Sequence, residues 1–326
     1  MRTTRLVFAL VAAASLSLAA CAAPEEKPAA AAGGPAASAG PALNLTPEQN
    51  RIVPAKDDAL AALVPADIRA TGKLTIGVGA SGSGFPPIAF TATDNKTLIG
   101  NDPDIGYAVA GLLGLEPVVE NTSWENLFIG LDSAKFNVGV SNITVTEERK
   151  EKYDFATYRL DNLAFVTKKG SGWKVTGPAD VAGKTVAVSS GTNQEKILVE
   201  WSKEAEKQGL KPVTIKYYQT NQATYLALGA GQIDLYLGPN PSVAYEVAIE
   251  PKFEIVGTYS GAGASLQGKI ALTTKKDNGL VKALGGAVDK LIATGDYQKI
   301  LQRWNLANEA MPSSEINPQG LPKEGK

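Results

Sequence analysis

Strand-like and helix-like segments alternate along this chain, and the alternation starts again about half-way. The first round contains three strand patterns separated by two helical patterns, in the order 74–78, 102–113, 117–120, 124–131 and 136–140. The second round repeats that order at 184–188, 193–207, 213–218, 222–228 and 233–237. Such alternation predicts an α/β fold with mostly parallel strands and helices on both faces of the sheet. The repetition is consistent with two lobes of the same build, although the general α/β pattern can produce it as well.

The first twenty residues have the pattern of a secretory signal peptide. Arg2 and Arg5 precede an apolar run, 6–18, that is too short to span a bilayer comfortably. The run ends at Leu18-Ala19-Ala20-Cys21, which looks like a bacterial lipobox, and Cys21 is the only cysteine of the chain. We therefore predict a signal peptide over 1–20 and lipidation of Cys21, which would anchor the protein to the outer face of a bacterial membrane. The alternative is an ordinary secretory signal with a chance cysteine.

The segments on either side of the α/β region are predicted to contribute little to a core. Residues 21–42 are mainly Ala, Pro and Gly after the cysteine and read as a disordered linker. Residues 43–71 form an N-terminal extension. The segment 309–326 is rich in Pro, Ser and Gly, which predicts a flexible tail.

Composition excludes several classes of function. Lys and Arg number 32 and Asp and Glu 33, so there is no basic excess to attract a nucleic acid. The chain has no histidine, which removes Ser–His–Asp and Cys–His catalysis and most zinc sites. We therefore predict no catalytic residue, no metal site and no cofactor.

A polar segment, 141–150, follows the apolar strand pattern 136–140 and carries Thr144 and Arg149. In an open α/β sheet, ligands bind at the edge where such strands end. The guanidinium of Arg149 is a planar fork of donors that suits a carboxylate, and Thr144 can add a hydroxyl and a backbone N–H. The alternative is that Arg149 is one charge on a solvated helix face.

Two further groups of residues are candidates for ligand contact. Thr192 and Asn193 stand between a strand and a helix, where free N–H groups and the helix dipole favour an anion; a simple N-cap is the alternative. Phe85 and Trp124 could enclose the body of a ligand between aromatic faces. For Trp124, at the start of an amphipathic helix, core packing is the competing interpretation.

These segments resemble, in the same order, the motifs of family 3 extracellular solute-binding proteins, the receptors of polar amino acid ABC importers. The resemblance spans about 72–305 and rests on five segments: 85–88, 100–104, 124–127, 142–149 and 183–194. It implies a two-lobed periplasmic-binding-protein fold of type II, the Venus-flytrap fold. Two chain crossings would form the hinge, near 161–165 and 257–262. The first lobe would comprise 72–163 plus 262–308, and the second lobe 164–261.

The resemblance also implies how a ligand is held. Asn142, Thr144 and Arg149 would clamp a carboxylate from one side, and Thr192 and Asn193 would meet it from the other. The protein would be the lipid-anchored, monomeric substrate-binding component of an ABC importer, with a membrane permease as its partner. Its ligand would be an amino acid or an amino-acid derivative.

The chain departs from the family at the position that holds the ligand's ammonium group. In the amino acid binders an aspartate stands five residues after the Asp of a Gly-x-x-Asp strand, whereas here Asp234 is followed at that distance by Pro239. Asn240 could supply a neutral acceptor instead. Gly82 stands where members that prefer basic ligands often have an acid. These departures point away from basic amino acids and favour a carboxylate whose positive group is muted or delocalised.

Two other functions fit the same fold. A cyclohexadienyl dehydratase-like enzyme would use an acid in the cleft, for which Asp102 and Glu125 are the available candidates. A ligand-sensing receptor would present the closed form to a signalling partner.

Overall fold

The computed structural model describes residues 42–80 and 84–323. The predicted signal peptide 1–20, Cys21, Gly82 and the linker up to residue 41 lie outside the described residues. Within 42–80 and 84–323, no helix combines the length and the apolar character that crossing a bilayer requires.

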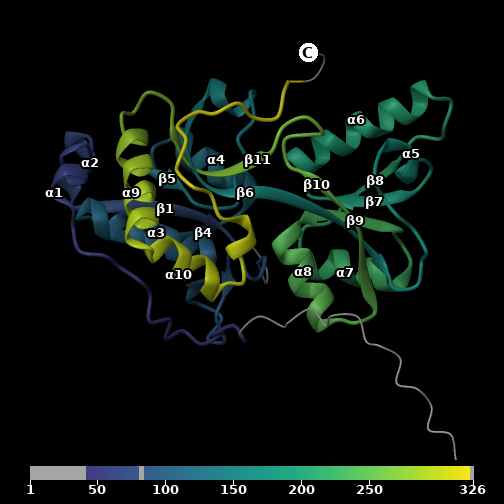
Figure 1. Ribbon diagram of the computed structural model, residues 1–326, viewed down its shortest axis with the longest axis horizontal. Helices are drawn as coiled ribbons and strands as arrows, with labels where there is room; N and C mark the ends of the chain where they lie inside the picture. The colour runs from purple at the N-terminus through teal and green to yellow at the C-terminus, as the bar shows by residue number, and fades with distance from the viewer. Residues whose placement is uncertain (1–41, 81–83, 324–326) are drawn as a thin grey trace, which may run out of the picture. The chain divides into compact units, whose positions relative to one another are not determined.

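Nine strands of the described chain form one sheet in the order β4-β1-β5-β11-β6-β9-β7-β8, with β10 paired to β6 (Figure 1). In chain order these strands are β1 Lys73–Gly79, β4 Glu116–Thr122, β5 Val138–Gly139, β6 Tyr153–Lys168, β7 Thr185–Val188, β8 Thr214–Tyr217, β9 Leu235–Pro239, β10 Phe253–Ser260 and β11 Gly268–Lys275. Parallel pairing joins β4, β1 and β5, and separately β8, β7 and β9. The two rounds of the sequence therefore form two parallel groups, one in each lobe. A short hairpin of β2 Phe90–Thr91 and β3 Leu98–Ile99 stands apart from this sheet.

Strand β6 carries the chain from the first lobe to the second. Its first part, Tyr153 to Asp161, pairs with β11, and its second part pairs with β9 and β10. The chain returns between the end of β10 and the start of β11, so two crossings link the lobes. The prediction of a two-lobed α/β fold with two crossings is confirmed.

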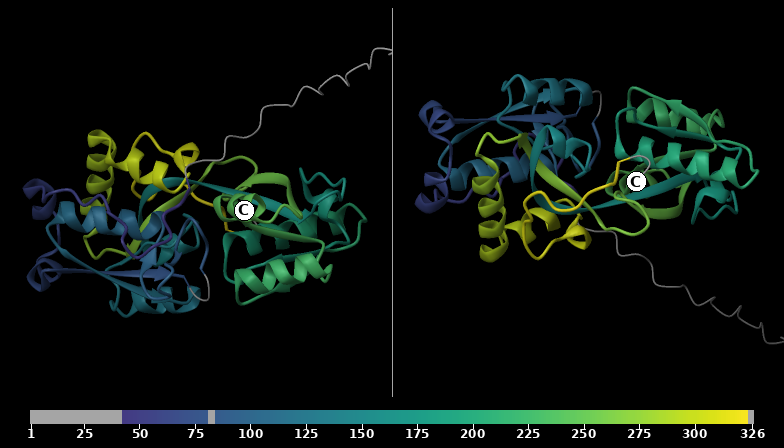
Figure 2. Two further views of the ribbon diagram at one scale, coloured as in Figure 1. Left: turned by 90° about the horizontal axis from the view of Figure 1, so that it is seen from below. Right: turned by 90° about the horizontal axis from the view of Figure 1, so that it is seen from above.

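In the first lobe, the sheet is covered by helices from both ends of the chain (Figure 2). These are α3 Asn101–Leu113, α4 Trp124–Asp132, α9 Val281–Thr294 and α10 Asp296–Arg303. Leu74 and Ile76 of β1 and Ile105 of α3 are fully buried in the largest apolar cluster. The buried Trp304 joins this cluster and donates its indole N–H to Asp104 Oδ2 at 2.9 Å. Asp104 thus anchors the C-terminal helices as well as standing at the start of α3.

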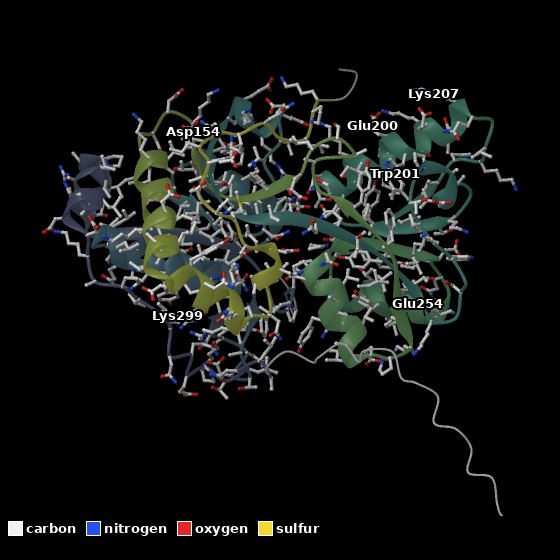
Figure 3. All side chains as sticks on the ribbon, in the orientation of Figure 1. Asp154, Glu200, Trp201, Lys207, Glu254 and Lys299 are labelled. Carbon is white, nitrogen blue, oxygen red and sulfur yellow. The ribbon has the colours of Figure 1, made fainter. Side chains whose placement is uncertain are left out.

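In the second lobe, α5 Pro178–Val181 and α6 Asn193–Lys207 cover one face of the sheet, and α7 Asn221–Ala230 and α8 Asn240–Ile249 cover the other (Figure 1). Trp201 of α6 faces the strands, as Figure 3 shows. Its ring stacks on Phe165 of β6 with centroids 5.4 Å apart. The apolar side of α6 therefore holds this helix against the crossing strand.

Residues 42–71 pack on the first lobe and include α1 Asp58–Ala62 and α2 Ala66–Thr71. Arg51 donates to Asp104 Oδ1 at 3.1 Å, and the backbone N–H of Asp57 donates to the Leu112 carbonyl at 2.9 Å. This extension thus adds to the first lobe before β1 begins.

The C-terminal segment is packed, which differs from the flexible tail that its composition predicts. After the short helix η2 Ala307–Glu309, backbone bonds join Thr157 to Glu315 at 3.0 Å and Leu321 to Val145 at 3.1 Å. Leu321 is also buried against an apolar cluster of the second lobe. The composition of this segment does not reveal the packing, because it rests on backbone groups and on single side chains, such as Glu309, Asn317 and Leu321, whose partners lie far along the chain.

Candidate ligand-binding site

A cavity of about 180 Å³ lies between the lobes and is lined by residues of both. The lining residues lie at the ends of six strands or in the loops that follow them. These strands are β1, β4 and β5 in the first lobe, and β7, β8 and β9 in the second. These strands belong to the two parallel groups, so the cavity lies at the carboxyl ends of both, where ligands bind in open α/β sheets.

The second lobe contributes the start of helix α6. Thr192 is its N-cap, and the Thr192 hydroxyl accepts from the backbone N–H of Glu195 at 3.2 Å. Thr192, Asn193 and Gln194 all line the cavity. Since the start of a helix carries the positive end of its dipole, this wall favours an anionic group. Thr192 is therefore both a helix cap and part of the cavity wall.

The first lobe contributes the two predicted aromatic residues. Phe85, in the loop after β1, lines the cavity and also packs against the first-lobe core. Trp124 is the first residue of α4 and lines the cavity from the same lobe. The indole N–H of Trp124 donates to the Gly191 carbonyl of the second lobe at 3.2 Å. Trp124 thus forms a wall of the cavity and a direct contact between the lobes.

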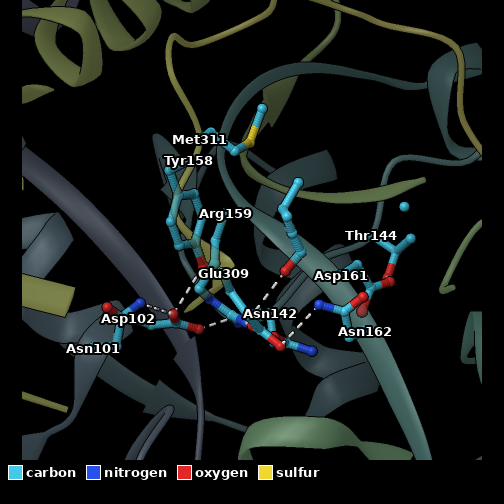
Figure 4. A network of polar contacts seen from close by, with 12 residues as sticks. Asn101, Asp102, Asn142, Thr144, Tyr158, Arg159, Asp161, Asn162, Glu309 and Met311 are labelled. Atoms are coloured by element: carbon cyan, nitrogen blue, oxygen red, sulfur yellow. Dashed lines mark hydrogen bonds and ion pairs between the residues drawn. The ribbon is translucent and has the colours of Figure 1, made fainter. Parts of the chain in front are cut away.

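Asn142 follows β5 and lines the cavity in a left-handed backbone conformation, with φ of 47°. Its backbone N–H donates to Asp102 Oδ2 at 2.7 Å, and its Oδ1 accepts from the guanidinium of Arg159 (Figure 4). Because arginine can only donate hydrogen bonds, this contact assigns Oδ1 to Arg159 and leaves the Nδ2 donors available to the cavity. Asn142 therefore offers a donor to an acceptor group of a ligand.

A buried charged network holds Asn142 in place (Figure 4). Arg159 of β6 forms an ion pair with Glu309, and both side chains are almost fully buried. Asp102 accepts from the Tyr158 hydroxyl at 2.9 Å. Burial raises the pKa of Asp102 and of Glu309, and the charge of Arg159 opposes both shifts. Asp102 does not line the cavity; it supports the loop that does.

Asp161, at the point where β6 crosses between the lobes, joins two predicted ligand residues. Its Oδ2 accepts from the Thr144 hydroxyl at 2.7 Å and from Asn193 Nδ2 at 3.1 Å. Thr144 is buried and does not line the cavity. Its hydroxyl is bonded to Asp161 and does not face a ligand. Burial raises the pKa of Asp161 to about 6, against the opposing effects of the Thr144 hydrogen bond and of Arg159.

Arg149 lines a second, neighbouring cavity of about 310 Å³ rather than the main one. Its Nη1 donates to the Thr144 carbonyl at 2.9 Å, and its Nη2 donates to the Gly191 carbonyl at 3.2 Å. The guanidinium lies over the Trp124 ring, 5.1 Å from its centroid. Burial lowers the pKa of Arg149 to about 10, so the side chain keeps its charge at neutral pH. In this conformation Arg149 ties the lobes together and fixes the loop before α6.

Asn240 does not line the cavity, although its neighbour Pro239 does. Asn240 is the first residue of α8, and its side chain forms a hydrogen bond with Glu309 that lowers the pKa of that carboxyl. The neutral acceptor proposed for the ligand's ammonium group is thus turned toward the buried network.

Several cavity residues carry no motif by which the sequence could reveal them. Tyr217 is the last residue of β8, Tyr218 follows it, and Tyr236 lies within β9. Strand ends are recognisable, but which aromatic side chains reach a shared cavity depends on how the strands pair. The sequence also gives no signal for Asp161, because its partners Thr144 and Asn193 come from different lobes and meet only in the folded protein.

Within the described chain, no group of three or more His, Cys, Asp or Glu side chains is arranged to hold a metal ion. Glu125 is exposed and is the one acidic residue among those that line the main cavity.

Two α/β lobes joined by crossing strands, with a small cavity enclosed between them, define a solute-binding protein. The model of the bacterial extracellular solute-binding proteins, family 3, matches residues 74–307. The chain therefore belongs to this family.

The chain is also similar to named amino acid-binding proteins. It is 29% identical over 231 residues to the L-cystine-binding protein TcyJ of Escherichia coli, covering 71% of this chain and 82% of that one. It is 28% identical over 273 residues to the arginine-binding protein ArgT of Corynebacterium glutamicum, covering 83% and 86%. A solved structure of an ancestral arginine-binding protein bound to arginine aligns with a TM-score of 0.61 and 27% identity, covering 72% of this chain and 98% of that one. These relatives are binding proteins rather than enzymes.

Proposed function

We propose that this protein is the lipid-anchored, monomeric substrate-binding component of an ABC importer. It captures a small carboxylate-bearing solute, an amino acid or an amino-acid derivative, between its lobes. The observation that carries this proposal is the cavity at the strand ends of both lobes. Its volume of about 180 Å³ is smaller than the roughly 300–1,000 Å³ typical of drug-sized ligands. The L-cystine- and arginine-binding relatives support amino acids or their derivatives as the ligand class.

The carboxylate of the ligand belongs at the start of α6. Thr192 and Asn193 approach that position from the second lobe, and the Nδ2 donors of Asn142 approach it from the first. The Thr192 hydroxyl donates to the Ser189 carbonyl at 2.6 Å, and Asn193 Nδ2 donates to Asp161 and to the Gly261 carbonyl. The second lobe would therefore meet the carboxylate with the backbone N–H groups and the dipole at the start of α6. A carboxylate that bridges the two walls would favour the closed arrangement of the lobes.

The predicted clamp role of Arg149 requires an exchange of hydrogen-bond partners. In this conformation the guanidinium binds the Gly191 carbonyl, so the ligand's carboxylate must replace that oxygen to reach it. A carboxylate is the stronger partner, because it adds an opposite charge and can accept two parallel hydrogen bonds from the guanidinium. Arg149 would then couple ligand binding to closure.

The body of the ligand fits between aromatic side chains from both lobes. Phe85 and Trp124 face the cavity from the first lobe, and Tyr217 and Tyr236 from the second. Such faces bury apolar groups and attract diffuse positive charge.

Intrinsic fluorescence provides a direct test, because Trp124 lines the cavity. We would titrate the purified protein with the twenty amino acids, L-cystine, glycine betaine and a cyclic amidine acid, and confirm hits by calorimetry. A carboxylated solute should bind with micromolar or tighter affinity, and Arg149→Met should weaken it by roughly 10- to 100-fold, the loss of one or two charge-assisted bonds. Trp124→Phe serves as the control for the optical signal. Binding restricted to solutes without a carboxylate would contradict the proposal.

The anchor at Cys21 and the transport role need a cellular test. Cys21→Ser should move the protein from the membrane fraction to the soluble extracytoplasmic fraction without changing its affinity in vitro. A wild-type protein found only in the soluble fraction would refute the lipid anchor. Loss of solute uptake on deletion of the gene, restored by the chain itself, would support a permease partner.

A further inference from the structure

A group of polar side chains lies in the second lobe, between helices α7 and α8. Asn221 and Tyr225 stand four residues apart on α7, and Ser242 and Glu246 stand four residues apart on α8. Residues with this spacing share one face of a helix. Asn221 Nδ2 donates to Glu246 Oε1 at 3.2 Å, so the two faces meet.

Three polar atoms of this group have no hydrogen-bond partner among the described residues: Asn221 Oδ1, Tyr225 Oη and Ser242 Oγ. Their residues are only 6%, 8% and 2% exposed. Leaving a buried donor or acceptor unsatisfied costs about 1–3 kcal/mol, so each such atom calls for a partner that the described chain does not supply. Three of them in one place indicate a site for a polar group that is not part of this chain.

Glu246 adds a charge to this group. No ion pair among residues 42–80 and 84–323 involves Glu246, whereas Glu250, the C-cap of α8, pairs with Lys252 at 3.1 Å. Burial raises the pKa of Glu246, and the charge of Glu250 raises it further. A half-buried carboxylate without a cationic partner is stabilised by any cation that reaches it.

The group adjoins the ligand cavity through a single layer of side chains. The Tyr225 ring contacts the Tyr236 ring edge-on, with centroids 5.7 Å apart, and Tyr236 lines the cavity. Tyr218 also lines the cavity and packs against the apolar cluster that contains Tyr225. Tyr236 is therefore the side chain that separates this group from the cavity.

We propose that Asn221, Tyr225, Ser242 and Glu246 form a distal subsite for a cationic, donor-rich end of the ligand, such as an ammonium, amidinium or guanidinium group. Glu246 and Asn221 Oδ1 accept hydrogen bonds from it, the two hydroxyls accept others, and the tyrosine faces favour its charge. This subsite deepens the proposed function and rests on it. At Pro239 the chain lacks the carboxylate that the family uses for the ligand's ammonium group. The subsite supplies an acid seven residues later, at Glu246 of α8.

The test compares L-arginine with L-citrulline, which has nearly the same shape but a neutral end. Calorimetry on the purified protein should show arginine binding at least tenfold more tightly, as expected for losing one hydrogen bond between charged groups. Glu246→Gln should reduce that ratio to less than threefold. Glu250→Gln, at the C-cap of the same helix, is the matched control and should leave the ratio unchanged. Thermal unfolding of each variant checks that the fold is intact.

Other results separate this inference from the proposed function. Equal affinity for arginine and citrulline, or a ratio that survives Glu246→Gln, overturns the distal subsite while the carboxylate site stands. The distal subsite is also overturned, and the carboxylate site stands, if the ligand that binds most tightly has a carboxylate but no positive group at its other end. If no carboxylated solute binds at all, the proposed function fails and the subsite fails with it.

Discussion

Asp161→Asn should stabilise the protein near neutral pH. The carboxylate of Asp161 is buried where β6 crosses between the lobes, and burial raises its pKa from 3.8 to about 6. Its neighbours are charged as well: Arg159 and Arg149 favour the ionised form, and Glu309 disfavours it. An asparagine has the same shape, and its amide oxygen can accept the same two hydrogen bonds, so the substitution removes a buried charge without leaving a cavity.

The magnitude follows from the difference between the folded and unfolded pKa values. The folded state binds the proton of Asp161 more tightly than the unfolded chain does, so its contribution to stability is fully present below pH 3.8 and is lost as the pH rises through about 6. A shift of about two pKa units corresponds to about 3 kcal/mol. At pH 7.5, Asp161→Asn should therefore raise the free energy of unfolding by up to about 3 kcal/mol, or the Tm by roughly 6–12 °C.

The assay is thermal and urea unfolding, followed by circular dichroism at pH 7.5 and at pH 4.5. The variant should be more stable than the wild type at pH 7.5, and the difference should shrink at pH 4.5, where the wild-type carboxyl is largely protonated. A variant less stable at pH 7.5, or a gain of equal size at both pH values, would refute the reasoning. The first result would mean that the ionised carboxylate is favourable where it stands.

Three other substitutions test the packing around the site. Glu309→Ala should lower the free energy of unfolding by about 3–5 kcal/mol in urea titrations, because it leaves the buried Arg159 without its ion-pair partner; a loss below 1 kcal/mol would contradict this. Gly320→Ala should lower the Tm measured by calorimetry, since a Cβ at that position would overlap the Val145 carbonyl oxygen and push the C-terminal segment off the first lobe. Gly229→Ala makes the same change inside α7, where the nearest atom is 3.8 Å away, and should instead stabilise by about 0.5–1 kcal/mol.

Much of the fold could be predicted because it rests on local signals. The helical pattern 193–207 coincides with α6, since Thr192 is recognisable as a cap and the apolar spacing follows one helix face. Strand β6 was harder to predict along its whole length. It carries Arg159 and Asp161 in its interior, and these charges interrupt the apolar pattern that marks a strand. They are stable there only because partners far along the chain satisfy them.

The candidate site was predictable in part. Phe85, Trp124, Asn142, Thr192 and Asn193 line the cavity because strand ends and helix starts can be read from local sequence.

Other predicted residues lie elsewhere in the structure. Thr144, Arg149 and Asn240 are near the cavity but bind other protein groups, since a motif does not specify the direction of a side chain. The sequence alone also pointed away from basic ligands, because neither Gly82 nor Pro239 offers an acid. The subsite proposed at Glu246 would change that expectation, since it places an acid on a helix whose role no motif marks.

The packing of residues 42–71 on the first lobe decides which half of the molecule can move when the protein is held at a membrane. A tether at Cys21, as proposed, would pull on the first lobe through Arg51 and its bonds to Asp104 and to the Leu98 carbonyl. The first lobe would then be the stationary frame, and opening or closing would appear as a swing of the second lobe relative to the bilayer. A distance reporter on α6 would register each capture of a solute, whereas the same reporter on α9 would stay almost still.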